Sequence, residues 1–158
     1  MEERKMKLYL VQHGNAAVKE VDPDRGLTER GKDDVGKVAD FIRSLNISAQ
    51  LWHSGKTRAA QTAEMLAKAM TVKCVVSGKE GLSPNDDVKK TKEQIESVDE
   101  DVMIVGHLPF LGKLVSLFVT GDESKGTIAF KQGCMVCLEC GEEKLCHVEW
   151  MVIPEILV

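Results

Sequence analysis

Two histidines each follow an apolar run that is typical of a buried strand. His13 comes after Leu8–Gln12, and His107 comes after a second run over residues 102–106. In open α/β sheets, ligands bind at the carboxyl ends of the strands. We therefore expect the two imidazoles, far apart in the sequence, to share one site.

Positively charged groups are expected at the same edge. Arg58 falls in the first turn of a predicted helix, where free N–H groups and the helix dipole favour an anion. Gln12, Asn15 and Arg25 join it as candidates. Imidazoles, guanidiniums and a helix N-terminus make a basic pocket, and such a pocket suits a phosphoryl group, whose charge is spread over three oxygens.

Other phosphate and metal chemistries lack their motifs. The sequence has no GxxxxGK[ST] loop and no GxGxxG, which disfavours the nucleotide-binding folds. Neither His13 nor His107 belongs to an HExxH pattern, and no carboxylates are arrayed nearby as metal ligands. We expect no metal and no cofactor.

Composition limits the partners. The 158 residues carry a formal net charge of −4, with 29 % charged and 43 % hydrophobic residues, as in an ordinary globular protein forming one domain over 1–158. This balance gives no reason to expect a nucleic-acid or anionic-membrane partner. No apolar run approaches the roughly 20 residues of a bilayer span. The charged N-terminus has no secretory signal, so the expected location is cytoplasmic.

Five cysteines, an odd number, fit a reducing compartment better than a disulfide framework. Four are close together: Cys134, Cys137, Cys140 and Cys146. Their spacing invites a zinc or iron–sulfur interpretation. However, residues 133–139 look like a strand, which would point Cys134 and Cys137 to opposite faces. We therefore expect these four cysteines to act as small buried hydrophobic residues.

Strands and helices alternate along the chain. Strands are predicted over 8–12, 49–52, 72–76 and 102–105, with two or three more between Thr127 and Val158 and a turn at 141–144. Helices are predicted from Thr28 as N-cap to about Leu45, over 59–70, over 87–98, and from Pro109 to Val119. The order implies an α/β fold with three layers, α/β/α.

Four motifs occur in an order that resembles the histidine phosphatase superfamily. They are Gln12-His13-Gly14, the R-G-L-T-E-R-G of 25–31, the S-G-K-T-R-A-A-Q-T-A of 54–63, and Gly106-His107-Leu108-Pro109. The short chain is similar to the SixA-type phosphohistidine phosphatases, and the resemblance spans residues 8–152. It implies a phosphoglycerate mutase-like fold with a mostly parallel central sheet.

The resemblance also implies a mechanism. His13 would be the nucleophile that forms a covalent phosphohistidine, which water then hydrolyses. Arg58 and His107 would bind the phosphoryl oxygens and stabilise the developing charge, helped by groups of Gly14 and Asn15. The expected partner is a phosphohistidine-bearing phosphoprotein of a phosphorelay, or a small phosphorylated molecule.

This chain departs from the family where an arginine usually precedes the nucleophile. Gln12 stands there, and glutamine lacks the charge and the bidentate fork. Losing one charge-assisted contact costs about 1.5–3 kcal/mol, or ten- to a hundredfold in rate. We hypothesise that Arg25 replaces part of the missing charge.

A second departure concerns the acid that protonates a leaving oxygen in many relatives. The loop after the third strand offers Glu80 and Asp86, both weak candidates. The nitrogen of a phosphoramidate leaves well once it is protonated, so the lack of an acid favours phosphohistidine over an alkyl phosphate ester. The sequence thus predicts a phosphohistidine phosphatase. The alternatives are a weakly active or non-catalytic phospho-ligand binding module, because of Gln12, and a phosphatase or mutase of a small phosphorylated metabolite.

Overall fold

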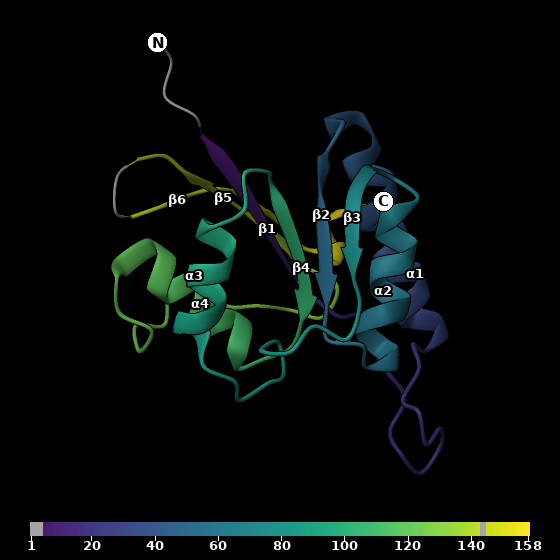
Figure 1. Cartoon of the computed structure of the whole chain (residues 1–158). Helices are drawn as coiled ribbons and strands as arrows, with labels where there is room; N and C mark the ends of the chain where they lie inside the picture. The colour runs from purple at the N-terminus through teal and green to yellow at the C-terminus, as the bar shows by residue number, and fades with distance from the viewer. Residues whose placement is uncertain (1–4, 143–144) are drawn as a thin grey trace.

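The computed structural model describes residues 5–142 and 145–158. Its central layer is one six-stranded sheet with the order β3-β2-β4-β1-β5-β6 (Figure 1). The strands are β1 (Met6–Gln12), β2 (Ser48–His53), β3 (Thr71–Val76), β4 (Val102–Gly106), β5 (Met135–Cys140) and β6 (His147–Val152). The first four are parallel, and β5 and β6 add to the free edge of β1 as an antiparallel pair. The predicted mostly parallel sheet is confirmed. The turn predicted at 141–144 includes Glu143 and Lys144, which lie outside the described residues.

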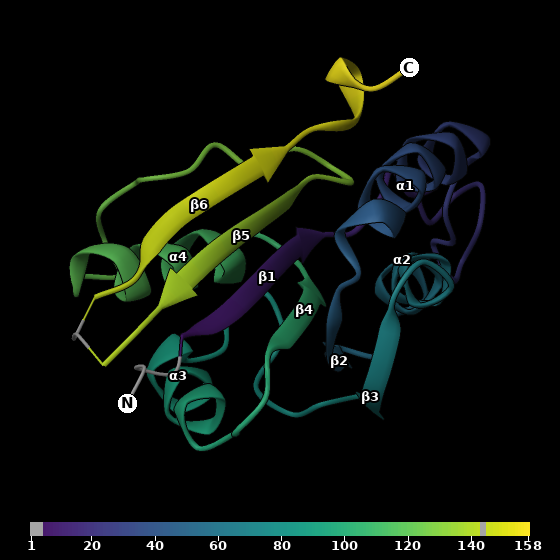
Figure 2. The same ribbon diagram turned by 90° about the horizontal axis from the view of Figure 1, so that it is seen from above.

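Helices cover both faces of the sheet. α1 (Glu29–Ile42) and α2 (Thr57–Ala67) pack on one face, and α3 (Val88–Glu96) and α4 (Phe110–Thr120) on the other (Figure 2). Short 3₁₀ helices follow α1 and β6, at Arg43–Leu45 and Pro154–Ile156. The predicted three-layer α/β/α architecture is therefore confirmed.

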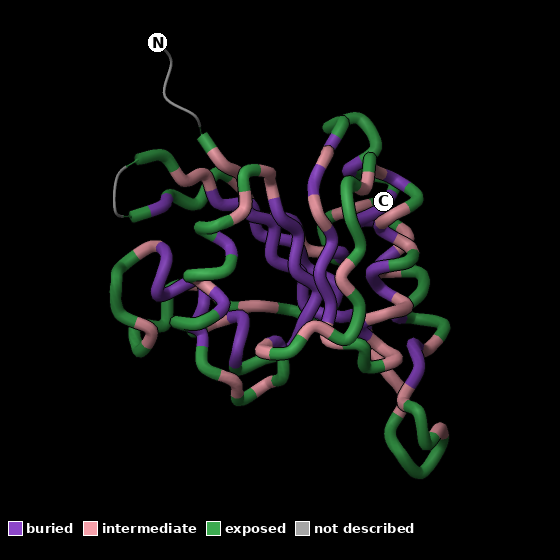
Figure 3. Tube along the Cα trace, viewed as in Figure 1, coloured by how far each residue is buried: buried purple, intermediate pink, exposed green. Residues whose placement is uncertain are grey.

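The alternation of side chains along β1 divides the core into two halves. Tyr9 and Val11 pack with α1 and α2, whereas Leu8 and Leu10 pack with α3 and α4, as the period of a strand requires. All five residues of β4, which lies between β1 and β2, are buried. Figure 3 shows this buried centre running along the strands.

Most element boundaries differ from the predicted ones by one to three residues, and two of the differences have a visible local cause. The helix expected to reach Leu45 ends at Ile42 and continues as a 3₁₀ turn, which Asn46 closes in the left-handed region at φ 52°. The last helix begins at Phe110 rather than at Pro109, because Pro109 is its N-cap after a cis Leu108–Pro109 bond. Thr28 is the N-cap of α1, as predicted, and its Oγ1 accepts the Gly31 N–H at 3.0 Å.

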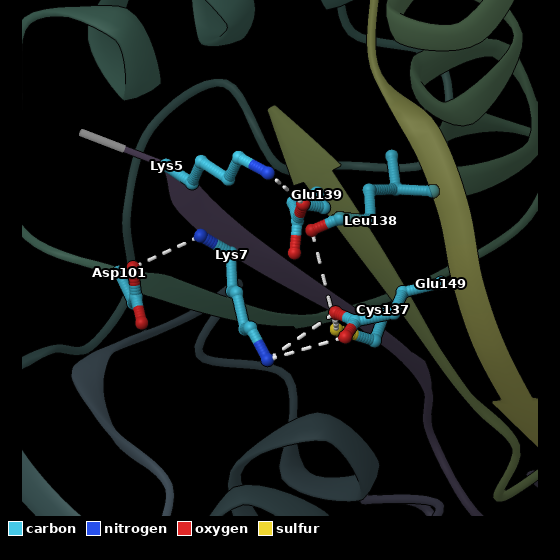
Figure 4. A network of polar contacts seen from close by, with 7 residues as sticks. All are labelled: Lys5, Lys7, Asp101, Cys137, Leu138, Glu139 and Glu149. Atoms are coloured by element: carbon cyan, nitrogen blue, oxygen red, sulfur yellow. Dashed lines mark hydrogen bonds and ion pairs between the residues drawn. The ribbon is translucent and has the colours of Figure 1, made fainter. Parts of the chain in front are cut away.

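Polar contacts attach the β5–β6 pair to β1 (Figure 4). Lys7 Nζ lies 3.3 Å from a carboxylate oxygen of Glu149, and Lys5 Nζ lies 3.4 Å from Glu139. The backbone N–H of Lys7 donates to Asp101 at 2.9 Å, which fixes the start of β1 beside β4. Burial and the carboxylate of Glu149 raise the pKa of the Cys137 thiol to about 12.

The four late cysteines fall into two kinds. Cys134 and Cys137 are buried free thiols, in agreement with the predicted role. Cys140 and Cys146 form a disulfide, so the prediction that they are merely small hydrophobic residues is wrong. The antiparallel pairing explains this, because it brings together the end of β5 and the residue before β6. Within residues 5–142 and 145–158, no three His, Cys, Asp or Glu side chains are grouped to hold a metal ion. In the same ranges, no helix is long and apolar enough to cross a bilayer.

Candidate active site

The two histidines lie side by side just past the carboxyl ends of β1 and β4, and these strand ends are at the lower edge of the sheet in Figure 1. β1 and β4 are parallel neighbours with Gln12 opposite Gly106, so the next residue of each strand emerges at the same place. The ring centroids of His13 and His107 are 5.1 Å apart, and the backbone N–H of His13 donates to the Gly106 carbonyl at 3.1 Å. The predicted convergence of these two imidazoles is confirmed.

The His13 ring has one defined proton position. Its Nδ1 lies 2.7 Å from the carbonyl oxygen of Gly14. Because a carbonyl only accepts, Nδ1 carries the hydrogen and the lone pair of the neutral ring is on Nε2. Burial lowers the pKa of His13, and the positive charges of Arg58 and Arg25 lower it further, against the opposite effect of the Gly14 bond. The ring is therefore held in the neutral form that a nucleophile needs.

A buried threonine connects His13 to the start of α2. Thr62 Oγ1 accepts the Gly14 N–H at 3.0 Å and donates to the Arg58 carbonyl at 2.8 Å. This corrects the expected role of Gly14, because its N–H is already bonded and is not offered to a phosphate. Thr62 was not predicted as a site residue, although it lies in the third motif, where its position one turn after Arg58 could have indicated this contact.

Arg58 lies in the first turn of α2, as predicted. Its side chain is half-buried, and its Nε is a buried donor with no hydrogen-bond partner. Desolvation lowers the pKa of Arg58, and the neighbouring positive charge of Arg25 adds to this effect. A guanidinium held in this way gains by meeting an anion.

His107 is bonded through one ring nitrogen only. Its Nε2 lies 2.7 Å from the Ser54 hydroxyl, and its Nδ1 is buried without a partner. Burial lowers the pKa of His107 to about 3, and the neighbouring His13 ring and the charges of Arg58, Lys56 and Arg25 lower it further. In the ligand-free protein His107 is thus a neutral ring.

Unpaired buried atoms mark the site. In the described part of the chain, only three buried side-chain nitrogen or oxygen atoms lack a partner: Gln12 Oε1, Arg58 Nε and His107 Nδ1. Buried polar atoms are normally hydrogen-bonded, so unpaired ones need an explanation. All three belong to residues predicted for the site. Their concentration there indicates that a polar ligand completes the hydrogen bonding.

Arg25 and Asn15 occupy the loops beside His13. Arg25 is half-buried in the left-handed region at φ 53°, and its Nε donates to the Ala17 carbonyl at 3.1 Å. The positive charge of Arg25 lowers the pKa values of His13, Arg58 and His107. This supports the hypothesis that Arg25 supplies part of the charge missing at Gln12. The Asn15 side chain instead joins two loops, with bonds to Thr28 and Gln132.

The two acid candidates belong to another cavity. Glu80 and Asp86 line a hollow of about 290 Å³ whose walls contain none of His13, Arg58 and His107. The charges that shift the pKa values of those three residues are all positive. One of them, Lys56, was not predicted. Lys56 is exposed at the N-cap of α2. In the sequence, only its position two residues before Arg58 could have identified it as a site residue.

The fold and the site define an α/β protein in which two imidazoles lie beside several cations at one edge of the sheet. Residues 8–83 match the family model of the histidine phosphatase superfamily (branch 1). The match covers 76 residues, just under half of the chain, and over that range the chain resembles this superfamily. The matched range contains three of the four motifs, and His107 lies beyond it.

Solved structures share the fold over nearly the whole chain. The protein histidine phosphatase SixA complexed with tungstate is 21 % identical, with a TM-score of 0.82 over 96 % of this chain and 99 % of that one. The alpha-ribazole phosphatase of Shigella flexneri is 14 % identical, with a TM-score of 0.73 over 94 % and 96 %. YhfR of Bacillus stearothermophilus is 17 % identical, with a TM-score of 0.67 over 91 % and 95 %. No curated protein sequence matches significantly.

Proposed function

We propose that this chain is a phosphohistidine phosphatase that works through a covalent phosphohistidine on His13. The observation that carries the proposal is the His13 ring, held neutral with its proton on Nδ1 beside Arg58 and His107. The likeness to SixA, which was solved with the tetrahedral oxyanion tungstate, gives further support.

The reaction has two steps. His13 Nε2 attacks the phosphorus in line, and the bond between phosphorus and the substrate's imidazole nitrogen breaks as that nitrogen takes a proton from solvent. Water then attacks the phosphorus on His13, which releases inorganic phosphate and restores the neutral ring. Arg58 Nε and His107 Nδ1, which are buried and unpaired, would bind the phosphoryl oxygens.

A phosphoramidate fits this site better than an alkyl phosphate ester. An ester needs an acid for its leaving oxygen, whereas the groups that shift the His13 and His107 pKa values include no carboxylate. The nitrogen of a phosphohistidine can be protonated by solvent, so the all-positive surroundings are no obstacle. We propose a phosphohistidine-bearing protein, such as a phosphorelay domain, as the substrate.

Phosphate release from a phosphohistidine peptide tests the proposal. The native protein should release phosphate and should carry phosphate on His13 when quenched at neutral or alkaline pH and analysed by mass spectrometry. His13→Ala should abolish both signals, whereas His147→Ala, at an exposed histidine of β6, should leave them unchanged. Tight binding without release would instead identify a binding module. Faster turnover of sugar phosphates would identify a metabolite phosphatase or mutase.

A further inference from the structure

Ser54 forms a hydrogen bond with the one ring nitrogen of His107 that has a partner. Its hydroxyl oxygen lies 2.7 Å from His107 Nε2. The other ring nitrogen, Nδ1, is buried and has no partner. The ring is only 2 % exposed, so water has little access to it. The direction of the Ser54–His107 hydrogen bond therefore determines whether Nδ1 offers a hydrogen or a lone pair to a ligand.

The surroundings of Ser54 leave its hydroxyl hydrogen available for donation to His107. Ser54 Oγ accepts the backbone N–H of Lys56 at 3.4 Å. Gly55, at φ +86°, gives the chain the turn that brings this N–H back to Ser54. With one lone pair engaged by Lys56, the hydroxyl hydrogen is free to point at His107 Nε2.

Donation by Ser54 fixes the tautomer of His107. The ring is neutral because burial, the neighbouring His13 ring and the positive charges of Arg58, Lys56 and Arg25 lower its pKa to about 3. A neutral imidazole carries one N–H only. If Nε2 accepts from Ser54, the hydrogen must be on Nδ1. The opposite tautomer would present a lone pair from Nδ1, which would repel a phosphoryl oxygen.

We propose that Ser54 is a positioning residue that places the His107 proton on Nδ1, so that this nitrogen donates to the bound phosphoryl group. The role rests on the proposed function and adds a residue to it. A hydroxyl suits the position for a second reason. When bound phosphate stabilises a protonated His107, Nε2 becomes a donor, and the Ser54 hydroxyl can rotate to accept from it. Nδ1 is a donor in both states.

Nitrogen NMR measures this arrangement directly. Long-range ¹H–¹⁵N spectra of ¹⁵N-labelled protein distinguish protonated from unprotonated ring nitrogens, and His107→Asn identifies the His107 signals. Native protein should show a protonated Nδ1 on His107. Ser54→Ala should shift the ring toward the Nε2–H tautomer, and Ser54→Thr, which keeps the hydroxyl, should retain Nδ1–H.

Tungstate binding, measured by calorimetry, should follow the tautomer. Ser54→Ala should weaken the affinity roughly three- to tenfold, the loss of about one hydrogen bond, and Ser54→Thr should restore it to within about twofold. A His107 ring with Nε2–H in the native protein would overturn the proposal, as would unchanged tautomer and affinity in Ser54→Ala. Neither readout requires turnover, so failure to hydrolyse phosphohistidine would contradict the proposed function alone.

Discussion

The Nδ1 atom of His13 and the carbonyl oxygen of Gly14 are 2.7 Å apart, so the proposed nucleophile is oriented by the residue that follows it in the chain. This short-range bond sets both the tautomer and the direction of the attacking nitrogen. It depends on the conformation of residues 14–16, which contacts with α1 and α2 hold in place. The predictions below test the charge, the composition and the rigidity of this arrangement.

The pH dependence should reflect the lowered pKa of His13. Burial is the main cause, and the charges of Arg58 and Arg25 add to it. Because the neutral ring is the proposed nucleophile, kcat/KM should stay level as pH falls through 6.5, the ordinary pKa of histidine, and should fall only in more acid solution. Arg25→Gln should raise the His13 pKa and move this acid limb to higher pH. Arg30→Gln, at an exposed arginine that pairs with Asp34, should not move it.

Gln12→Arg should strengthen phosphoryl binding. Gln12 is 8 % exposed with an unpaired Oε1, and a guanidinium there would add a charge-assisted hydrogen bond worth about 1.5–3 kcal/mol. Tungstate affinity and kcat/KM should rise about ten- to a hundredfold. Gln12→Met is the matched control. The Gln12 Oε1 atom makes no hydrogen bond within the protein, so this substitution should change the free energy of unfolding by less than about 1 kcal/mol. A folded Gln12→Arg protein with unchanged or weaker binding would contradict the prediction.

Gly31→Ala should damage both stability and activity. A Cβ on Gly31 would clash with the carbonyl oxygen of Asn15, so the loop after Gly14 would have to move. We expect a loss of about 1–3 kcal/mol in urea unfolding and a fall in kcat/KM of roughly tenfold or more. A Cβ added at Gly36, in the same helix, would lie 3.9 Å from its nearest neighbouring side-chain atom. Gly36→Ala should therefore stabilise the folded protein by up to about 1 kcal/mol. Equal effects of the two substitutions would show that close contact at Asn15 is unimportant.

The cysteines should differ in reactivity. Cys74 is an exposed free thiol, whereas Cys134 and Cys137 are buried, and the pKa of Cys137 is raised to about 12. Since the thiolate is the reactive form, a native unreduced sample treated with iodoacetamide should be modified at Cys74 alone. Cys134 and Cys137 should react after denaturation, and Cys140 and Cys146 only when a reductant is also present. Native modification of a Cys74→Ser variant would contradict this order.

Much of the fold was predictable because the strong signals are local. The run before His107 indicated a strand covered on both faces, and β4 is buried throughout. Thr28 indicated a helix start through its own side chain, and the structure has it as the N-cap. The disulfide was missed because it depends on the pairing of β5 with β6, and strand pairing is a long-range property.

The same distinction applies to the site. His13, Arg58 and His107 were predicted as site residues because strand ends and a helix start are readable features, although their catalytic roles stay a proposal. The partners that orient them were not predicted. Ser54 and Thr62 act through contacts with residues from other elements, and nothing in the local sequence shows which loop a hydroxyl will meet.

Because β5 runs antiparallel to β1, the domain needs the part of the chain that leads into β5. The segment leading into it returns to the reactive histidine, where the Gly133 N–H donates to the Gln12 carbonyl at 3.0 Å and to the His13 carbonyl at 3.2 Å. A fragment truncated at Gly121 would retain every motif residue and still lack this support. It would also leave β1 as an unpaired edge open to aggregation. The motifs therefore mark the candidate site, but the last quarter of the polypeptide is needed to keep its backbone in place.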